Sequence, residues 1–298
     1  MSNILKSTLA LLAIGTMMAP VAKAADPLLQ PGNAPQEFSV FAEGFGGFTN
    51  LGSNGAIGAN EDDKYGLIGG NLGVMTSVGS VGLQLDIFGE NNFENSGSDD
   101  TYEDAFGAAL HLNTDVNQMY TVGVFGAVAR VGIDSGNRDA TSWILGAEGM
   151  ARVDLGGNPS AVFLQGGFLD TSRDNNPIRN AGFIRGGVNT SLTEQVSVGG
   201  NVAYARGRMD GDNERVNVLA WGARVSFDAR EILPVPATLF ADYAGARFKQ
   251  NGENDRITDN TFIFGISFGF GNYENDSKKR FDIPRFYRWV GQTGGPLE

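Results

Sequence analysis

Apolar and polar side chains alternate with a period of two along most of the chain after residue 37. In residues 196–205, Val198, Val202 and Tyr204 occupy alternate positions, and mostly small or polar residues lie between them. Residues 219–227 repeat this pattern with larger apolar side chains. Because successive side chains of a strand point to opposite faces, the alternation indicates strands with one apolar face and one face of small or polar residues.

Twelve segments of this kind follow one another, separated by stretches rich in turn-forming residues. They cover residues 37–48, 65–77, 81–90, 103–112, 118–131, 142–153, 161–169, 180–191, 195–206, 216–227, 237–248 and 260–271. An even number of antiparallel strands is typical of a single-chain membrane barrel. The pattern therefore predicts an all-β fold, a transmembrane antiparallel β-barrel of about 12 strands over residues 37–271.

The connections between these segments alternate in length. Long ones at 49–64, 91–102, 132–141, 170–179, 207–215 and 249–259 interleave with short turns such as 78–80, 113–117 and 192–194. The connection at 228–236 breaks this rule, being long where a short turn is expected. A soluble β-sandwich would show the same alternation within each strand. Long loops on one side and short turns on the other are instead the arrangement of a membrane barrel.

The N-terminal residues resemble an export signal. Lys6 precedes a largely apolar stretch at residues 7–18, and Ala22 and Ala24 are small residues at the positions that a signal peptidase reads. We expect residues 1–24 to be a signal peptide and residues 25–36 to be a periplasmic N-terminal segment. An N-terminal membrane anchor is the alternative, but the stretch is shorter than the roughly 20 apolar residues that a spanning helix needs.

Composition narrows the class of protein further. The 298 residues include no cysteine, which excludes a disulfide framework and a thiolate metal site. A net charge of -12 argues against nucleic acid as a partner, since phosphates require basic surfaces. Glycine accounts for 43 residues, roughly twice its usual share of about 7%. Such an excess suits a barrel, in which neighbouring backbones come close together.

The last predicted strand resembles the terminal strand of outer-membrane β-barrel proteins, the porin-like and OmpA-like group. In that group a glycine is followed three and five residues later by outward hydrophobic residues, and Gly265, Phe268 and Phe270 match this pattern. Ile263 departs from it, because family members usually have a polar residue there. The resemblance implies a location in the Gram-negative outer membrane, contact with its lipid and lipopolysaccharide, and recognition of this strand by the barrel-assembly machinery.

The sequence shows no convincing catalytic or metal-binding constellation. The only histidine is His111, and no serine lies two residues after it, as resemblance to the outer-membrane phospholipases would require. We expect its ring to be a polar lumen group near a periplasmic turn. Residues 210–214 have the acidic spacing of a calcium loop only in its first half, since Arg215 and Trp221 occupy positions that need glycine and glutamate. We therefore expect no enzyme activity, no cofactor and no metal.

Charged residues recur on the predicted lumen face. By alternation, the lumen receives Glu43, Asp86, Glu90, Glu148, Arg152, Arg185, Arg224 and Asp242. Charges at membrane depth are costly unless they face water or one another. Two functions follow: a passive channel for small solutes, or a structural or anchoring protein with a closed, salt-bridged lumen. A barrel of about 12 strands is wide enough for either, and the sequence identifies neither a solute nor an oligomeric state.

Aromatic rings share the predicted inward faces. They are Phe41, Phe45, Phe88, Phe125, Phe163, Phe183 and Phe240. Rings at these positions would narrow the lumen or line a path for partly apolar solutes. The alternative is that bulges shift the register of some strands, so that the rings face lipid.

Residues 272–298 follow the closing strand and begin, by strand parity, on the periplasmic side. This tail concentrates Lys278, Lys279, Arg280, Arg285 and Arg288 against one carboxylate in residues 278–289, with aromatic residues interleaved. Two placements are open. The tail lies in the periplasm, on the rim or against a partner, or it folds back as a plug, because tethering gives it a high effective concentration at a lumen with excess carboxylates.

Overall fold

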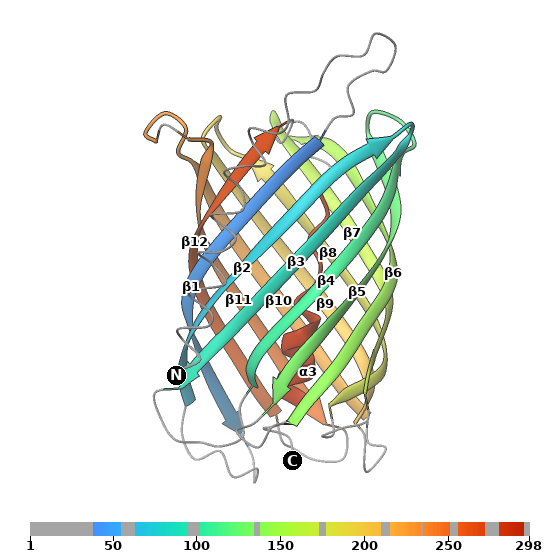
Figure 1. Ribbon diagram of the computed structural model, residues 1–298, viewed down its shortest axis with the longest axis vertical. Coiled ribbons are helices and arrows are strands. Elements are labelled where there is room, and N and C mark those ends of the chain that lie inside the picture. The colour runs from blue at the N-terminus through green and yellow to red at the C-terminus, as the bar shows by residue number, and fades with distance from the viewer. Residues whose placement is uncertain are drawn as a thin grey trace. The chain divides into compact units, whose positions relative to one another are not determined.

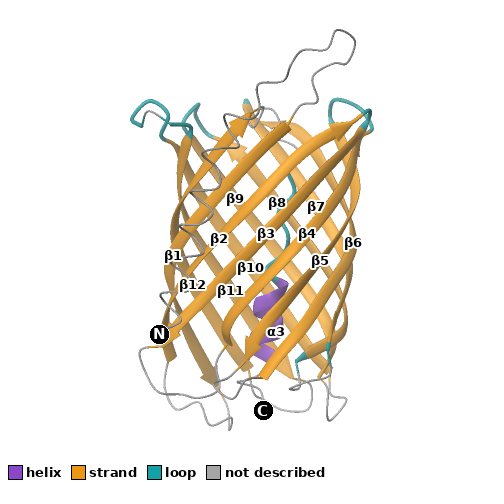
Figure 2. Cartoon of the chain, in the orientation of Figure 1, coloured by secondary structure: helices purple, strands orange, loops and turns teal. Residues whose placement is uncertain are grey.

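The computed structural model describes residues 38–54, 63–94, 102–133, 138–172, 177–209, 215–233, 235–250, 256–271 and 280–294. Within these residues, 12 antiparallel strands form a closed barrel (Figure 1, Figure 2). Each strand pairs with its neighbours in sequence, and the last strand pairs with the first to complete the barrel. The predicted fold class and strand number are confirmed. The predicted signal peptide and the segment at 25–36 lie outside the described residues.

The strands follow one another without an intervening helix in the described chain. They are β1 (Phe38–Asn54), β2 (Asp63–Val78), β3 (Val81–Glu94), β4 (Tyr102–Asp115), β5 (Tyr120–Ile133), β6 (Arg138–Leu155), β7 (Asn158–Thr171), β8 (Ile178–Ser191), β9 (Val196–Met209), β10 (Arg215–Asp228), β11 (Ala237–Gln250) and β12 (Arg256–Gly271). Most connections at one end of the barrel, here called the long-loop end, are longer than those at the other, the short-turn end. The exception at the short-turn end is the connection between Asp228 and Ala237, which is long, as the sequence indicates.

The outer face of the barrel is apolar. Every strand exposes at least one large apolar side chain: Phe48, Ile68, Leu85, Phe106, Val124, Leu145, Leu164, Ile184, Val202, Val225, Leu239 and Phe264. On β5, Val124 is 53% exposed, whereas its neighbour Phe125 is 2% exposed on the inner face. An apolar surface that encircles a closed sheet is the surface that lipid covers. The barrel is therefore membrane-spanning.

None of the helical segments in the described part of the chain is long and apolar enough to cross a membrane.

On the inner face, aromatic rings repeatedly pack over glycines of the neighbouring strand. Inward rings lie opposite a glycine of the following strand in the pairs Phe41–Gly73, Phe45–Gly69, Phe88–Gly107, Phe125–Gly146, Phe163–Gly187 and Phe240–Gly265. A Cβ at any of these glycines would overlap the opposing ring. The glycine excess thus has a local cause, since only glycine leaves room for a ring to lie flat against the wall. All the phenylalanines predicted to point inward do so.

Several strands extend past their predicted ends at the long-loop end. β1 continues from residue 48 to Asn54, β3 from residue 90 to Glu94, and β12 begins at Arg256 rather than at residue 260. These extensions carry mostly polar residues. Alternation of apolar and polar residues cannot detect them, although their backbones still pair. The bulges that the structure does contain, at Tyr102/Asp104 and Arg179/Gly182, lie at strand ends and leave the central register intact.

Residues 280–294 lie inside the barrel. They comprise an extended segment at 280–285 and the helix α3 (Phe286–Gly294), which is seen within the strands in Figure 2. Phe281 contacts Gln84, near the short-turn end of β3, and Thr293 accepts a hydrogen bond from the backbone of Ile178 at the long-loop end of β8. The segment therefore runs along the lumen from the short-turn end to the long-loop end. Residues 272–279 and 295–298 lie outside the described residues.

Candidate functional site in the barrel lumen

The predicted lumen charges occupy inward-facing positions of six strands, as the alternation of each strand requires. They do not form one ring around an open channel. The structure divides them into separate groups, and most of these groups are completed by residues 280–294.

The first group surrounds His111, near the short-turn end. The imidazole Nδ1 lies 2.9 Å from Glu148 Oε1, and Nε2 lies 3.5 Å from Asp86 Oδ2. The ring stacks between Phe125 and Phe281, with centroid distances of 5.6 and 6.4 Å. His111 is fully buried. It therefore acts as a bridge between two buried carboxylates, and the tail supplies one of the rings that cover it.

Gln84 and Gln165 fasten the extended part of the tail to the wall. The Gln84 amide nitrogen donates to the carbonyl of Phe281 at 2.7 Å, and its oxygen accepts from the Phe281 backbone N–H at 3.2 Å. Gln165 donates to the carbonyl of Asp282 at 3.0 Å, and Arg185 donates to the same carbonyl at 2.8 Å. Such paired contacts fix the backbone of two consecutive tail residues in one place.

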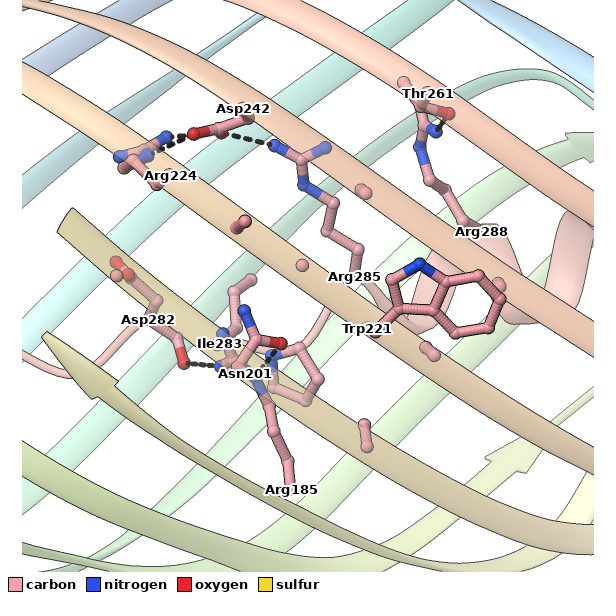
Figure 3. A pocket seen from close by; sticks show the side chains of 18 of the residues that line it. Arg185, Asn201, Trp221, Arg224, Asp242, Thr261, Asp282, Ile283, Arg285 and Arg288 are labelled. Atoms are coloured by element: carbon pink, nitrogen blue, oxygen red, sulfur yellow. Dashed lines mark hydrogen bonds and ion pairs between the residues drawn. The ribbon is translucent and has the colours of Figure 1, made fainter.

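The second charged group is centred on Arg224. Its guanidinium donates to Asp242 Oδ1 at 2.6 Å and to Glu43 Oε2 at 3.2 Å, and it lies 4.1 Å from the centroid of the Phe240 ring. Arg285 of the tail lies 3.5 Å from Asp242. Figure 3 shows Arg224, Asp242 and Arg285 in one series of contacts. Two arginines, one from the wall and one from the tail, thus share one carboxylate.

The third group is at the long-loop end, where α3 lies. Arg288 lies 2.7 Å from Glu90 Oε1 and 3.8 Å from Asp259 Oδ2, and it donates to the Thr261 hydroxyl at 2.6 Å. Gln292 donates to the Tyr65 hydroxyl at 2.8 Å. All of these side chains are buried, so the charge of Arg288 is compensated within the lumen and not by solvent.

Arg152 lies apart from the other predicted charges. Its guanidinium lies 3.3 Å from Asp115 and donates to the carbonyl of Gln118 at 2.9 Å, beside the turn between β4 and β5. It does not line the central cavity that the structure describes. Arg152 therefore acts as a rim residue that fastens a turn.

Apolar packing surrounds α3 in the lumen. The α3 side chains Phe286, Tyr287, Trp289 and Val290 are buried in one core with residues of all 12 strands. Tyr287 stacks on Phe88 at a centroid distance of 5.3 Å, and Trp289 meets the edge of Phe183 at 6.2 Å. Burial of such rings is strongly stabilising. The helix is short because it begins two residues after Pro284 and ends at Gly294.

A cavity of about 210 Å³ remains between the tail and the wall. It is bordered by β7 to β12, by β1 to β3, and by the tail from Arg280 to Trp289. Charged groups of both signs face it, among them Asp242, Arg185 and Arg285 (Figure 3). The cavity is therefore polar, and its size suits a few water molecules or a small solute fragment, not an open pore.

Several residues of these groups were not predicted. Asp259 faces the lumen, but it precedes the predicted start of its strand by one residue. Gln84, Gln165 and Thr261 fall on the inward faces by alternation, and a search for charges alone misses them. The described residues contain no group of three or more metal-binding side chains that could hold an ion. The acidic loop at 210–214 lies outside the described part of the chain.

The residues of the predicted assembly signal lie on β12, at the closing seam. Gly265 lies beneath the Phe240 ring, as described above. Phe268 lies opposite Ala42 of β1 and Ala237 of β11, and Phe270 is 44% exposed on the outer face. Ile263, which departs from the family pattern, is buried on the inner face with Leu67 and Phe240. An apolar residue fits this position because the lumen wall is apolar there.

Sequence comparisons identify no relative of this chain: no protein-family model and no curated protein matches it. Solved structures do. The barrel resembles an outer membrane channel from Pseudomonas putida F1, with a TM-score of 0.52 and 13% identity over 81% of this chain and 100% of that one. The translocator domain of the autotransporter NalP from Neisseria meningitidis matches with a TM-score of 0.48 and 14% identity, over 88% of this chain and 98% of that domain.

The likeness to the channel concerns the fold. Together with the apolar outer face and the two kinds of connection, it confirms the predicted resemblance and the outer-membrane setting that the resemblance implies. The fold of this chain is that of the 12-stranded outer-membrane β-barrels.

Proposed function

We propose that this protein is an outer-membrane channel for small solutes and that residues 280–294 are a plug that closes it. The observation that carries the proposal is the way in which the tail is held. Polar side chains of the wall bind the tail from the short-turn end to the long-loop end, at Gln84, Gln165, Asp242 and Glu90. The plug is thus matched to the lumen along its described length.

Charge balance supports a removable plug. On the lumen wall away from the rim, the carboxylates of Glu43, Asp86, Glu90, Glu148, Asp242 and Asp259 outnumber the guanidinium groups of Arg185 and Arg224. Arg280, Arg285 and Arg288 of the tail, set against its own Asp282, supply part of the missing positive charge. With the plug displaced, the surplus carboxylates would face water, where their charge is tolerated and favours cations.

The plug makes two kinds of contact with the wall: apolar packing by its rings, and ion pairs by its arginines. The rings of α3 are buried in the apolar core, whereas Arg285 and Arg288 of the tail border the cavity. Displacement requires breaking the ion pairs of these arginines with Asp242 and Glu90, and the cavity is where a solute or water can first enter. The contacts at Arg224 serve the wall itself, because Glu43, Arg224 and Asp242 remain paired without the tail.

A reversible cross-link tests this proposal. The chain contains no cysteine, so the double variant Ile178→Cys/Thr293→Cys can form one disulfide between the wall and α3. The two residues are neighbours, since the Ile178 backbone N–H donates to Thr293 Oγ1 at 2.9 Å. We expect the oxidised protein to be silent in planar bilayers and reduction to restore stepwise openings. Ile178→Cys alone is the control. Silence of both oxidised and reduced protein would support the structural or anchoring function and would contradict the channel.

A further inference from the structure

The phenylalanine rings that lie over glycines on the inner face are each covered by another side chain. The wall covers three of these rings, with Arg224 on Phe240 at 4.1 Å, Arg185 on Phe163 at 5.0 Å and His111 on Phe125 at 5.6 Å. The tail covers the other three, with Arg280 on Phe41 at 3.6 Å, Arg285 on Phe45 at 5.8 Å and Tyr287 on Phe88 at 5.3 Å. Guanidinium groups thus cover four of these rings. A ring that turns its face to the lumen is a favourable place for a cation.

The three rings that the tail covers belong to one surface of the wall. It consists of Phe41, Glu43 and Phe45 on β1 and Asp86, Phe88 and Glu90 on β3, here called the checkerboard. Across β2, each ring of one strand lies in the same row as a carboxylate of the other, and each ring also alternates with carboxylates along its own strand. Gly69 and Gly73 of β2 leave the space that the rings of β1 occupy. The checkerboard therefore places a carboxylate beside every ring.

The tail arginines use both elements of this surface. Arg285 lies over the Phe45 ring and 3.5 Å from Asp242 of the adjoining wall, and Arg288 lies 2.7 Å from Glu90. Arg280 lies over Phe41, whose ring borders the space over Gly73 together with the Asp86 carboxylate. A guanidinium group is planar and weakly hydrated, so it stacks on a ring while its N–H groups donate to a carboxylate. The compact, strongly hydrated ammonium of lysine fits such a place less well.

Backbone groups of the tail are bound as well. The Gln84 side chain, two residues before Asp86 on β3, donates to the carbonyl of Phe281 at 2.7 Å and accepts from its N–H at 3.2 Å. Gln165 and Arg185 donate to the next carbonyl, that of Asp282, at 3.0 and 2.8 Å. These contacts do not depend on the side chains of the occupant. The wall thus binds an extended peptide backbone next to a surface for guanidinium groups.

We propose that the checkerboard binds short arginine-containing peptides when the plug is displaced, and that the plug occupies it as a tethered peptide of the same kind. This inference rests on the proposed function, because the plug covers the checkerboard until the channel opens. It names the solute class as extended peptides with arginines spaced like Arg280 and Arg285. The tether raises the effective concentration of the tail, so a free peptide competes well only after the tether is cut.

The test is peptide binding by the full chain, folded with a protease site inserted within residues 272–279 and then cut. The labelled probe is an alanine–glycine peptide with two arginines five positions apart. A second peptide carries citrulline, the uncharged isostere of arginine, at both positions, and a third carries lysine. Native mass spectrometry measures the fraction of barrels that bind each peptide. We expect the arginine peptide to bind about tenfold or more tightly than the citrulline peptide, with the lysine peptide between them.

A change in the wall tests the site itself. Phe41→Leu/Phe45→Leu removes two rings of the checkerboard and keeps the positions apolar, so the arginine peptide should bind about tenfold or more weakly. Phe106→Leu/Phe168→Leu, on the outer face, is the matched control and should bind as the unaltered protein does. Unchanged binding by the first variant would overturn the proposal. Should that variant fail to fold, the citrulline comparison still decides, because it leaves the wall unaltered.

Further outcomes separate this inference from the channel itself. Equal binding of the arginine and citrulline peptides, or no binding of either, would overturn the inference. An ion current through the cut protein in that case would leave the channel function in place. Binding of the arginine peptide without any current would support the checkerboard as a peptide site and would contradict the channel.

Discussion

Arg288, on the helix inside the barrel, lies 2.7 Å from Glu90 on β3, and both side chains are almost completely buried. The two residues are 198 positions apart in sequence. Their contact joins the end of the chain to the wall at the level where α3 is packed. A buried ion pair is not by itself a large source of stability, but loss of one partner leaves the other charged and unpaired. The pair therefore helps to hold α3 in place, together with the packing of its rings.

Removal of this pair should loosen the plug and leave the barrel folded. Arg288→Gln leaves Glu90 and Asp259 without their cation, and the loss of one partner of a buried pair costs about 3–5 kcal/mol. We expect faster hydrogen exchange in residues 280–294 and unchanged exchange in the strands. The double variant Glu90→Gln/Arg288→Gln should exchange more slowly than the single variant, because no orphaned charge remains at Glu90. Additive effects of the two changes would show that the residues do not act as a pair.

Ion selectivity should depend on the wall arginines of the central lumen and not on the rim. In a plug-free form, Arg185→Gln/Arg224→Gln leaves Glu43, Asp86 and Asp242 less opposed, so the preference for cations should rise. Arg152→Gln is the matched control, since Arg152 pairs with Asp115 at a turn. Reversal potentials under a salt gradient measure both. A shift caused by Arg152→Gln, or none caused by the double change, would place the conducting path elsewhere.

The seam strand should matter for assembly more than other lipid-facing strands. Phe268→Asp/Phe270→Asp puts charge on the outer face of β12, and Phe106→Asp/Phe168→Asp puts the same charge on β4 and β7, where the rings are more exposed. Both changes carry a desolvation cost in lipid. We expect the first variant to be lost from the outer membrane of cells and the second to accumulate at a higher level. Equal loss would mean that lipid-facing charge, and not the terminal strand, is limiting.

Much of the barrel could be predicted because alternation is a local property. Glu43, Arg224 and Asp242 reach the lumen by strand parity alone, and their contact follows from pairing of neighbouring strands and closure of the barrel. The Arg288 contacts could not be predicted, because they depend on where a separate segment lies. The helix α3 has only nine residues and follows Pro284, so its sequence carries no strong helix signal. It is stabilised by packing against the rings of the wall. Asp259 was missed because polar strand ends show no apolar alternation.

The central claim is that residues 280–294 close a channel that the barrel otherwise provides. Single-channel recording in planar bilayers tests it most directly, with the full-length chain compared with a form that ends after Gly271, the last residue of β12. We expect the full-length protein to be closed most of the time and the shortened form to give stepwise, salt-dependent currents that favour cations. Identical conductance of the two forms, with both folded as judged by heat-modifiable migration, would contradict the account.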